Sequence, residues 1–362
     1  MRSPGRVNLI GDLTGDTKGF VLSAAIDKEI ICAISANYSD TCQVHAYNLR
    51  DTESFNVTKF KKSDKRWMNL VLGVVEQFQK RKLEVKGFDC VFGGDIPIGA
   101  GLASSAAISC AFAHGLSLLF EHGLSRPEVV NIARSAIKDY ESIDSGIMDQ
   151  FASVFGKANQ VFTLNGITME HEYFNFPFQE YRLILCDTGV KNADTITAQA
   201  DRRQEIETGT ALLKKHLKSI QSLRDVSLDL LSKHEAEFDP VIYRRCRIVL
   251  EENSRVLDCC EMLKKDDMPG FGQNMYKSHD SLRVDYEMSC KKLDYLKEKV
   301  QTSGMAIGSR MMVKGFGGSA INIVQVEKVD AFIKFVEEVY SAEYGRQLKT
   351  YPLKIANGTG KI

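Results

Sequence analysis

The sequence has no excess of charge of either sign, because 47 Lys and Arg residues balance 47 Asp and Glu residues. A neutral chain has no overall field that would draw it to nucleic acid or to an anionic membrane. It also has no apolar run of about 18 residues, the length that a membrane-spanning helix needs. Its first residues, MRSPGRVN, lack the apolar core of a signal peptide. We therefore expect a cytoplasmic protein that binds neither nucleic acid nor membranes.

Cysteine patterns that hold metals or disulfide frameworks are also missing. The chain has nine cysteines, but none forms a CxxC pair, and no Cys or His spacing matches a metal site. Several cysteines lie inside apolar runs, such as Cys32 in IICAI and Cys186 in LILCD. This pattern is typical of buried, reduced thiols in a cytosolic protein.

What the sequence does contain is a globular composition, 44% hydrophobic and 26% charged, over 362 residues. That length exceeds one average domain, so we expect two domains. Strands are predicted at 28–38, 42–47, 53–57, 88–92, 181–187, 320–326 and 347–354. Helices are predicted at 67–81, 126–141, 281–301 and 328–341. Because strands and helices alternate without a regular βαβ repeat, the pattern favours an α+β fold.

The most informative segment is Gly94–Ala107, GDIPIGAGLASSAA, which joins small residues to two serine hydroxyls. Such a loop lets backbone N–H groups approach an anion closely. The apolar helix predicted over 108–120 adds unpaired N–H groups and a positive dipole end. Together these features predict a phosphate cradle. An ordinary Gly-rich turn capped by serine is the alternative.

Two further segments place polar side chains among apolar ones. Ser3–Ile26 carries Asp12 and Asp16 in a polar loop between two apolar stretches. This loop suits a polyhydroxylated ligand, although a solvated hairpin connection has the same composition. In DSGIMDQFASVFGK, Asp149 lies amid apolar residues, where a charge needs a partner. That context indicates a functional site, with a structural cap as the alternative.

With these three segments in order, the chain resembles the GHMP small-molecule kinases, and among them the galactokinases. PGRVNLIG followed by GFVLSAAID is similar to the galactokinase signature block, and IPIGAGLASSAA is similar to the family's ATP loop. SGIMDQFASVFGK is similar to the block that carries the catalytic Asp. Two later blocks, SHDSLRVDYEMSCKKLD and SRMMVKGFGGSAINIV, follow in the family's order. The resemblance therefore extends over nearly the whole chain.

The resemblance implies the two-domain GHMP kinase fold, with a ribosomal-protein-S5-like N-terminal domain over residues 1–170 and a ferredoxin-like C-terminal domain over residues 171–362. It implies transfer of the γ-phosphoryl group of ATP to a sugar hydroxyl, with Mg²⁺ as cofactor. Arg6 and Asp149 fall on the family's catalytic pair: Asp149 would accept the hydroxyl proton, and Arg6 would hold that carboxylate ionised. The ATP loop would comprise Pro97, Gly99, Ala100, Gly101, Leu102, Ala103, Ser104 and Ser105.

The sugar-binding loop departs from the family's pattern. The family's GEHTDYNGG reads GDLTGDTKG here, so its Glu, His and Asp contacts become Asp12, Leu13 and Gly15. Later in the chain, Gln199 replaces the family's sugar-contacting tyrosine. The neighbouring Asp16 offers a different contact with the sugar. The predicted sugar-binding residues are Arg6, Asp12, Asp16, Gly146, Asp149 and Gln199. Galactose is the expected substrate, with another aldose or a sugar derivative as the alternative.

The metal-binding positions also differ. The resemblance assigns the Ser105 hydroxyl to Mg²⁺, but the family's acidic metal ligand falls on Ile137. Asp139 or Asp144 would have to replace it, and we take Asp139 as the candidate.

These changes leave a second function open. The retained Arg6, Asp149 and glycine-rich loop favour an ATP-dependent sugar kinase that acts on the anomeric hydroxyl. The altered sugar and metal positions are also compatible with a non-catalytic sugar or nucleotide sensor. A dinucleotide-binding dehydrogenase is disfavoured, because no acidic residue ends a second strand about 20 residues after the loop. We expect sugar and ATP as the partners of a monomer or weak homo-oligomer.

Overall fold

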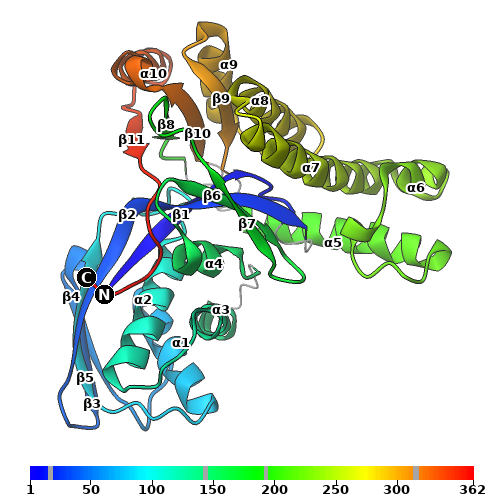
Figure 1. Ribbon diagram of the computed structural model, residues 1–362. Coiled ribbons are helices and arrows are strands. Elements are labelled where there is room, and N and C mark those ends of the chain that lie inside the picture. Colours follow the sequence, from blue (N-terminus) through cyan, green and yellow to red (C-terminus); the bar gives the residue numbers. More distant parts are fainter. Residues whose placement is uncertain (15–18, 142–145, 191–194, 313–317) are drawn as a thin grey trace.

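The computed structural model describes residues 1–14, 19–141, 146–190, 195–312 and 318–362. The chain forms two β-sheets with helices packed on them, which confirms the α+β prediction (Figure 1). The N- and C-terminal ends lie beside each other, where Arg2 pairs with Gly360. No helix among the described residues has both the length and the apolar character that a bilayer crossing requires.

The first sheet has seven strands in the order β4-β3-β5-β2-β6-β7, and β1 pairs with β2 outside this path. Neighbouring strands are antiparallel, except that β3 and β5 run parallel. Strand β2 is long because it pairs with β1, β5 and β6 along its length. The strands are β1 (Arg2–Ile10), β2 (Phe20–Ala36), β3 (Thr41–Ala46), β4 (Asp51–Asn56), β5 (Phe88–Gly94), β6 (Gln160–Asn165) and β7 (His171–Asn175).

Four helices lie together on one side of this sheet (Figure 1). They are α1 (Arg66–Lys80), α2 (Ser104–Leu119), α3 (Arg126–Glu141) and α4 (Met148–Phe155). The core between them and the sheet contains Phe78, Phe88 and Phe112, all fully buried. Helix α3 begins as predicted: the Ser125 N–H and hydroxyl both donate to the Glu128 carboxylate, a variant of the capping box.

The second sheet has the order β11-β8-β10-β9 and is antiparallel throughout. Its connectivity is β-α-β-β-α-β, the ferredoxin-like arrangement that the resemblance implied. Five helices fill the first crossover and α10 fills the second. The elements are β8 (Tyr181–Asp187), α5 (Thr195–His216), α6 (Leu228–Lys233), α7 (Pro240–Lys264), α8 (Met268–Val284), α9 (Lys291–Ser303), β9 (Ala306–Met311), β10 (Ser319–Gln325), α10 (Val329–Tyr344) and β11 (Lys349–Leu353).

The predicted helix over 281–301 is wrong. Helix α8 ends at Val284 and α9 begins at Lys291. Between them Glu287 adopts a left-handed φ of 55°, and the side chains of Tyr286 and Met288 are buried in the second core. Tertiary packing therefore overrides the helical tendency of this stretch.

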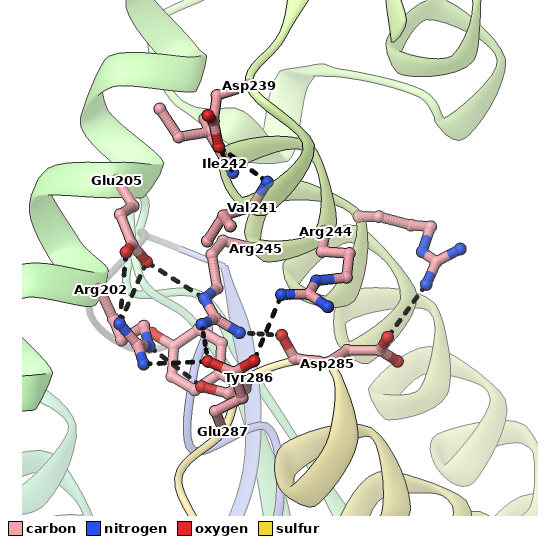
Figure 2. Close-up of polar contacts among 11 residues, drawn as sticks. Arg202, Glu205, Asp239, Val241, Ile242, Arg244, Arg245, Asp285, Tyr286 and Glu287 are labelled. Atoms are coloured by element: carbon pink, nitrogen blue, oxygen red, sulfur yellow. Dashed lines mark hydrogen bonds and ion pairs between the residues drawn. The ribbon is translucent and has the colours of Figure 1, made fainter.

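The sequence predicts that Arg202-Arg203 and Arg244-Arg245 lie on solvated helix faces. Arg203 is exposed and Arg244 is partly exposed, but Arg245 is buried and the Arg202 side chain is only 16% exposed. Arg245, on α7, is 1% exposed and donates to Glu205 on α5 and to Glu287 and the Asp285 carbonyl in the α8–α9 connection (Figure 2). Arg202 bonds to the same connection through the Tyr286 carbonyl. The buried Arg245 and the partly exposed Arg202 thus link α5, α7 and the α8–α9 connection.

The connection between the two halves runs through β7 and the C-terminal segment. Strand β7 pairs with β6, so the first sheet extends to Asn175. After β11 the chain returns to the first sheet, where Ile355 bridges Ile26. The division at residues 170 and 171 stays a prediction.

Candidate functional site

Arg6 and Asp149 form a buried ion pair. The Arg6 Nε and Nη2 atoms each lie 2.9 Å from the Asp149 Oδ1 atom. Arg6 comes from β1 and is 1% exposed, and Asp149 is in the first turn of α4. The positive end of a helix favours a carboxylate at that position. Asp149 lies amid apolar residues in the sequence, where a charge needs a partner, and the structure shows that this partner is Arg6.

The same arginine reaches the glycine-rich loop. Arg6 Nη1 donates to the Gly101 carbonyl at 2.5 Å, and the Arg6 backbone N–H donates to the Leu102 carbonyl at 3.0 Å. Gly5 makes this approach possible, because a Cβ there would lie only 2.7 Å from the Leu102 oxygen. One strand thus brings the predicted acid and the predicted phosphate loop to one place.

The loop has the backbone of an anion cradle. Gly99, Gly101 and Ala103 have φ values of 82°, 81° and 61°, the left-handed region that glycine adopts without strain. Alternation between left- and right-handed residues turns successive N–H groups to one side. Helix α2 then begins at Ser104 with Ala103 as its N-cap, which provides no side-chain acceptor. Its first N–H groups are left for an external anion.

Asp12 is held inside the protein. Its side chain is fully buried, with Oδ2 3.0 Å from Arg310 Nη1 and Oδ1 2.5 Å from Asn8 Nδ2. Arg310 also donates to the Asn8 carbonyl. Side chains from β1 and β9 therefore bind the Asp12 carboxylate, and this residue holds its loop in position. Leu13 next to it is 5% exposed and belongs to the second core, which also contains Ile184 and Cys186.

The other predicted sugar contacts are less completely described. Gly146 has a φ of 72° and immediately precedes Ile147, the N-cap of α4. This glycine therefore lies three residues before Asp149 at the start of the same helix. Asp16 and the side chain of Gln199 lie outside the described residues.

The structure does not bring Asp139 to the glycine-rich loop. Its carboxylate binds Lys80 Nζ at 2.8 Å and Gln77 Nε2 at 2.7 Å, both near the C-terminal end of α1. The bond from Lys80 holds the pKa of Asp139 below its ordinary value. Ile137 is the residue that faces α2, in a small apolar cluster with Leu70 and Ala106. Asp144 lies outside the described residues.

Ser105 remains beside the loop. It lies in the first turn of α2, and its hydroxyl is 3.5 Å from the Arg66 guanidinium. A hydroxyl is a suitable oxygen donor for Mg²⁺, so this part of the donor set fits the cofactor that the resemblance implies. A carboxylate from Asp139 does not.

Sequence reasoning missed Arg310. It lies in SRMMVKGFGG, on a strand whose neighbours are apolar, and it is fully buried. An arginine in a buried strand requires an acidic or carbonyl partner. The presence of Arg310 in such a strand could therefore have indicated that a partner lies elsewhere in the chain. The partner, Asp12, is 298 residues away, so no local pattern indicated it.

Comparisons with known proteins match both halves of this site. The model of the GHMP kinases N terminal domain matches residues 69–157, which include the glycine-rich loop and Asp149. The galactokinase galactose-binding signature matches residues 1–36, which include Arg6 and Asp12. A galactokinase of Thermotoga maritima is 33% identical over 365 residues, covering 100% of this chain and 99% of that protein. The chain belongs to the galactokinase family. A galactokinase of Roseiflexus sp. is 31% identical over 362 residues, covering 100% of this chain and 92% of that one.

Solved structures of a galactokinase and of a mevalonate kinase are similar to this chain over nearly its full length. Lactococcus lactis galactokinase complexed with galactose has a TM-score of 0.94 and 29% identity, covering 100% of this chain and 94% of that one. Methanococcus jannaschii mevalonate kinase has a TM-score of 0.69 at 17% identity, covering 99% of this chain and 98% of that one, and shares the fold. The two-sheet architecture is therefore the GHMP kinase fold.

Proposed function

We propose that this chain is an ATP-dependent sugar kinase that transfers the γ-phosphoryl group to the anomeric hydroxyl of galactose or a closely related aldose. The observation that carries the proposal is the placement of Arg6, which contacts both Asp149 and the Gly101 carbonyl of the glycine-rich loop. The Arg6 guanidinium thus bonds both to Asp149, the proposed proton acceptor, and to the loop that would bind the phosphates. Phosphoryl transfer depends mostly on such positioning and on charge stabilisation.

In this proposal Asp149 accepts the proton of the sugar hydroxyl as that oxygen attacks the γ-phosphorus. A hydroxyl is a poor nucleophile until its proton has an acceptor. Arg6 favours the charged form of the carboxylate through the ion pair. Its remaining charge offsets the negative charge that spreads over the transferred phosphoryl group.

The ATP phosphates would lie on the loop and at the start of α2. Pro97 and the residues from Gly99 to Ser105 would supply backbone N–H donors and hydroxyls. Ser105 would help to hold Mg²⁺, which supplies positive charge that neutralises the β- and γ-phosphates. The nucleotide would then lie between two domains, over 1–170 and 171–362, with β7 at the start of the second range still paired to the first sheet.

Galactose is the proposed sugar because the most similar relatives are named galactokinases. Arg6, Gly146 and Asp149 would bind it, with Asp16 and Gln199 as the further contacts that this chain offers. Asp12 would position its loop and would not contact the sugar directly, because its carboxylate oxygens already bond to Arg310 and Asn8. Leu13 supplies no hydrogen bond where the family has His. A site with fewer polar contacts discriminates less strongly between epimers.

A panel of monosaccharides with MgATP tests the proposal, with ADP release measured by a coupled assay and the product identified by ³¹P NMR. We expect a sugar 1-phosphate from galactose or from an aldose that differs at one hydroxyl. Sugar binding in a thermal-shift assay without ADP release from any member of the panel would contradict it. That result would instead support the sensor function.

A further inference from the structure

Three metal-ligating side chains meet on the surface of the second half, away from the proposed kinase site. They are His216, His234 and Glu237, and one ligand atom from each lies within 4.8 Å of the others. His216 is the last residue of α5, His234 follows α6, and Glu237 belongs to the short turn that precedes α7. Among the described residues this is the one such group of His, Cys, Asp and Glu side chains.

The three side chains are already oriented toward one another. Glu237 Oε2 lies 2.7 Å from His216 Nε2, and Glu237 Oε1 lies 2.7 Å from His234 Nδ1. The two imidazole rings are stacked, with centroids 3.8 Å apart and planes at 22°. Stacking places both rings edge-on to the same carboxylate. The ligand atoms therefore face one small volume.

The separations are close to those of a tetrahedral site. Zn²⁺ binds nitrogen and oxygen at about 2.0–2.2 Å, which places neighbouring ligand atoms about 3.3 Å apart. The His–Glu distances of 2.7 Å need to open by a few tenths of an ångström. All three side chains are partly exposed, so they have room to rotate toward an ion.

We propose that His216, His234 and Glu237 bind a divalent transition-metal ion of the Zn²⁺ type, with water in the fourth position. Two imidazoles and one carboxylate suit Zn²⁺, whereas Mg²⁺ prefers oxygen ligands and retains its waters. The side chains are 33%, 22% and 46% exposed, so an ion reaches the site from solvent. The negative end of the α5 dipole favours a cation at His216. Lys214 and Lys215 in the same turn oppose it, because their positive charges repel a cation.

Such an ion would join the C-terminal end of α5 to the segment that leads into α7. These two helices already contact each other, and Arg245 on α7 bonds to Glu205 on α5. The site would thus be structural, because Asp149 and the glycine-rich loop belong to the other half of the molecule. Loss of the ion would lower stability without removing any group from the proposed reaction.

The test uses the full chain without an affinity tag. Zn²⁺ affinity is measured by competition with a chromophoric chelator, and Co²⁺ binding by visible absorption. We expect one bound Zn²⁺ per chain, and we expect bound Co²⁺ to absorb visible light with the high intensity that tetrahedral coordination gives. His216→Ala and His234→Ala should each weaken binding by at least about tenfold, because each removes one of three protein ligands. His45→Ala is the matched control, since His45 bonds to Thr52 on β4, outside the cluster.

Thermal unfolding with added Zn²⁺ provides the second readout. An ion that binds only the folded state raises the midpoint by mass action, in the parent chain and in His45→Ala but not in His234→Ala. Glu237→Gln keeps the size of the side chain and decides the matter if an alanine variant fails to fold. Equal Zn²⁺ affinity in the parent and in Glu237→Gln or His216→Ala would overturn the proposal, as would binding indistinguishable from a buffer control.

Discussion

At the scale of single residues, the ion pair of Arg6 and Asp149 is the feature on which both stability and chemistry depend. Arg6 is 1% exposed, so removal of the Asp149 side chain would leave a buried guanidinium without its acceptor. Breaking a buried pair typically costs about 3–5 kcal/mol of unfolding free energy. A neutral variant at position 149 that keeps an oxygen acceptor for Arg6 Nε therefore separates the catalytic effect from the structural one.

His279 gives a pH dependence of stability. It is fully buried, its Nδ1 accepts the Met311 N–H at 3.1 Å, and burial lowers its pKa below the ordinary 6.5. The folded state therefore binds this proton less readily than the unfolded state. Stability from this group is fully present above pH 6.5 and is lost as the pH falls toward the lowered pKa.

His279→Gln should reduce that loss. We expect the unfolding free energy of the parent to fall more between pH 7.5 and 5.5 than that of the variant, by about 1 kcal/mol. Urea titrations at the two pH values measure it. Parallel losses in the two proteins would show that His279 is not the group responsible.

At the scale of elements, the relation of α1, α2 and α3 determines which residues reach a metal. Position 137 faces α2, and it is occupied by isoleucine. Two residues later on α3, about 200° around a helix of 3.6 residues per turn, Asp139 faces Lys80 on α1. The bonds of the Asp139 carboxylate to Lys80 and Gln77 thus argue against Asp139 as a replacement for the acidic ligand.

A pair of variants tests this assignment. Ser105→Ala should raise the Mg²⁺ concentration for half-maximal turnover several-fold, because it removes an oxygen donor at the start of α2. Asp139→Asn should leave the Mg²⁺ dependence unchanged and lower the unfolding free energy by no more than about 1 kcal/mol, as expected for an exposed ion pair. Magnesium titrations of both variants measure these effects. The reverse pattern would place the metal at Asp139.

Most elements followed from local patterns, and the exceptions have long-range causes. Helix α3 spans the predicted residues because Ser125 and Glu128 mark its start. The break between α8 and α9 escaped detection because it depends on Arg245 and on burial of Tyr286. The His216 and His234 pair was also invisible, because the two residues are 18 positions apart in the sequence and α6 lies between them. Their proximity appears only in the structure, where both rings bond to Glu237.

At the scale of the whole molecule, the C-terminal segment joins the two sheets. After β11 the chain returns to β1, where the buried Ser3 hydroxyl bonds to the hydroxyls of Ser153 and Thr359, and the Thr359 hydroxyl donates to the Ser153 carbonyl. Ser153 lies on α4, four residues after Asp149. The segment that closes the fold therefore also supports the helix that carries the proposed proton acceptor. The sequence predicted Arg6 and Asp149 through the resemblance, but their contact with the loop required the three-dimensional structure.

Turnover of Asp149→Asn on the preferred sugar is the most direct test of the account. The amide oxygen still accepts from Arg6 but no longer takes a proton, so the variant should fold, bind MgATP and sugar, and lose roughly 10²–10⁴-fold in kcat. Circular dichroism and thermal-shift binding verify the fold and the ligands. A folded variant that turns over at the parent rate would contradict the role of Asp149 and the proposed mechanism with it.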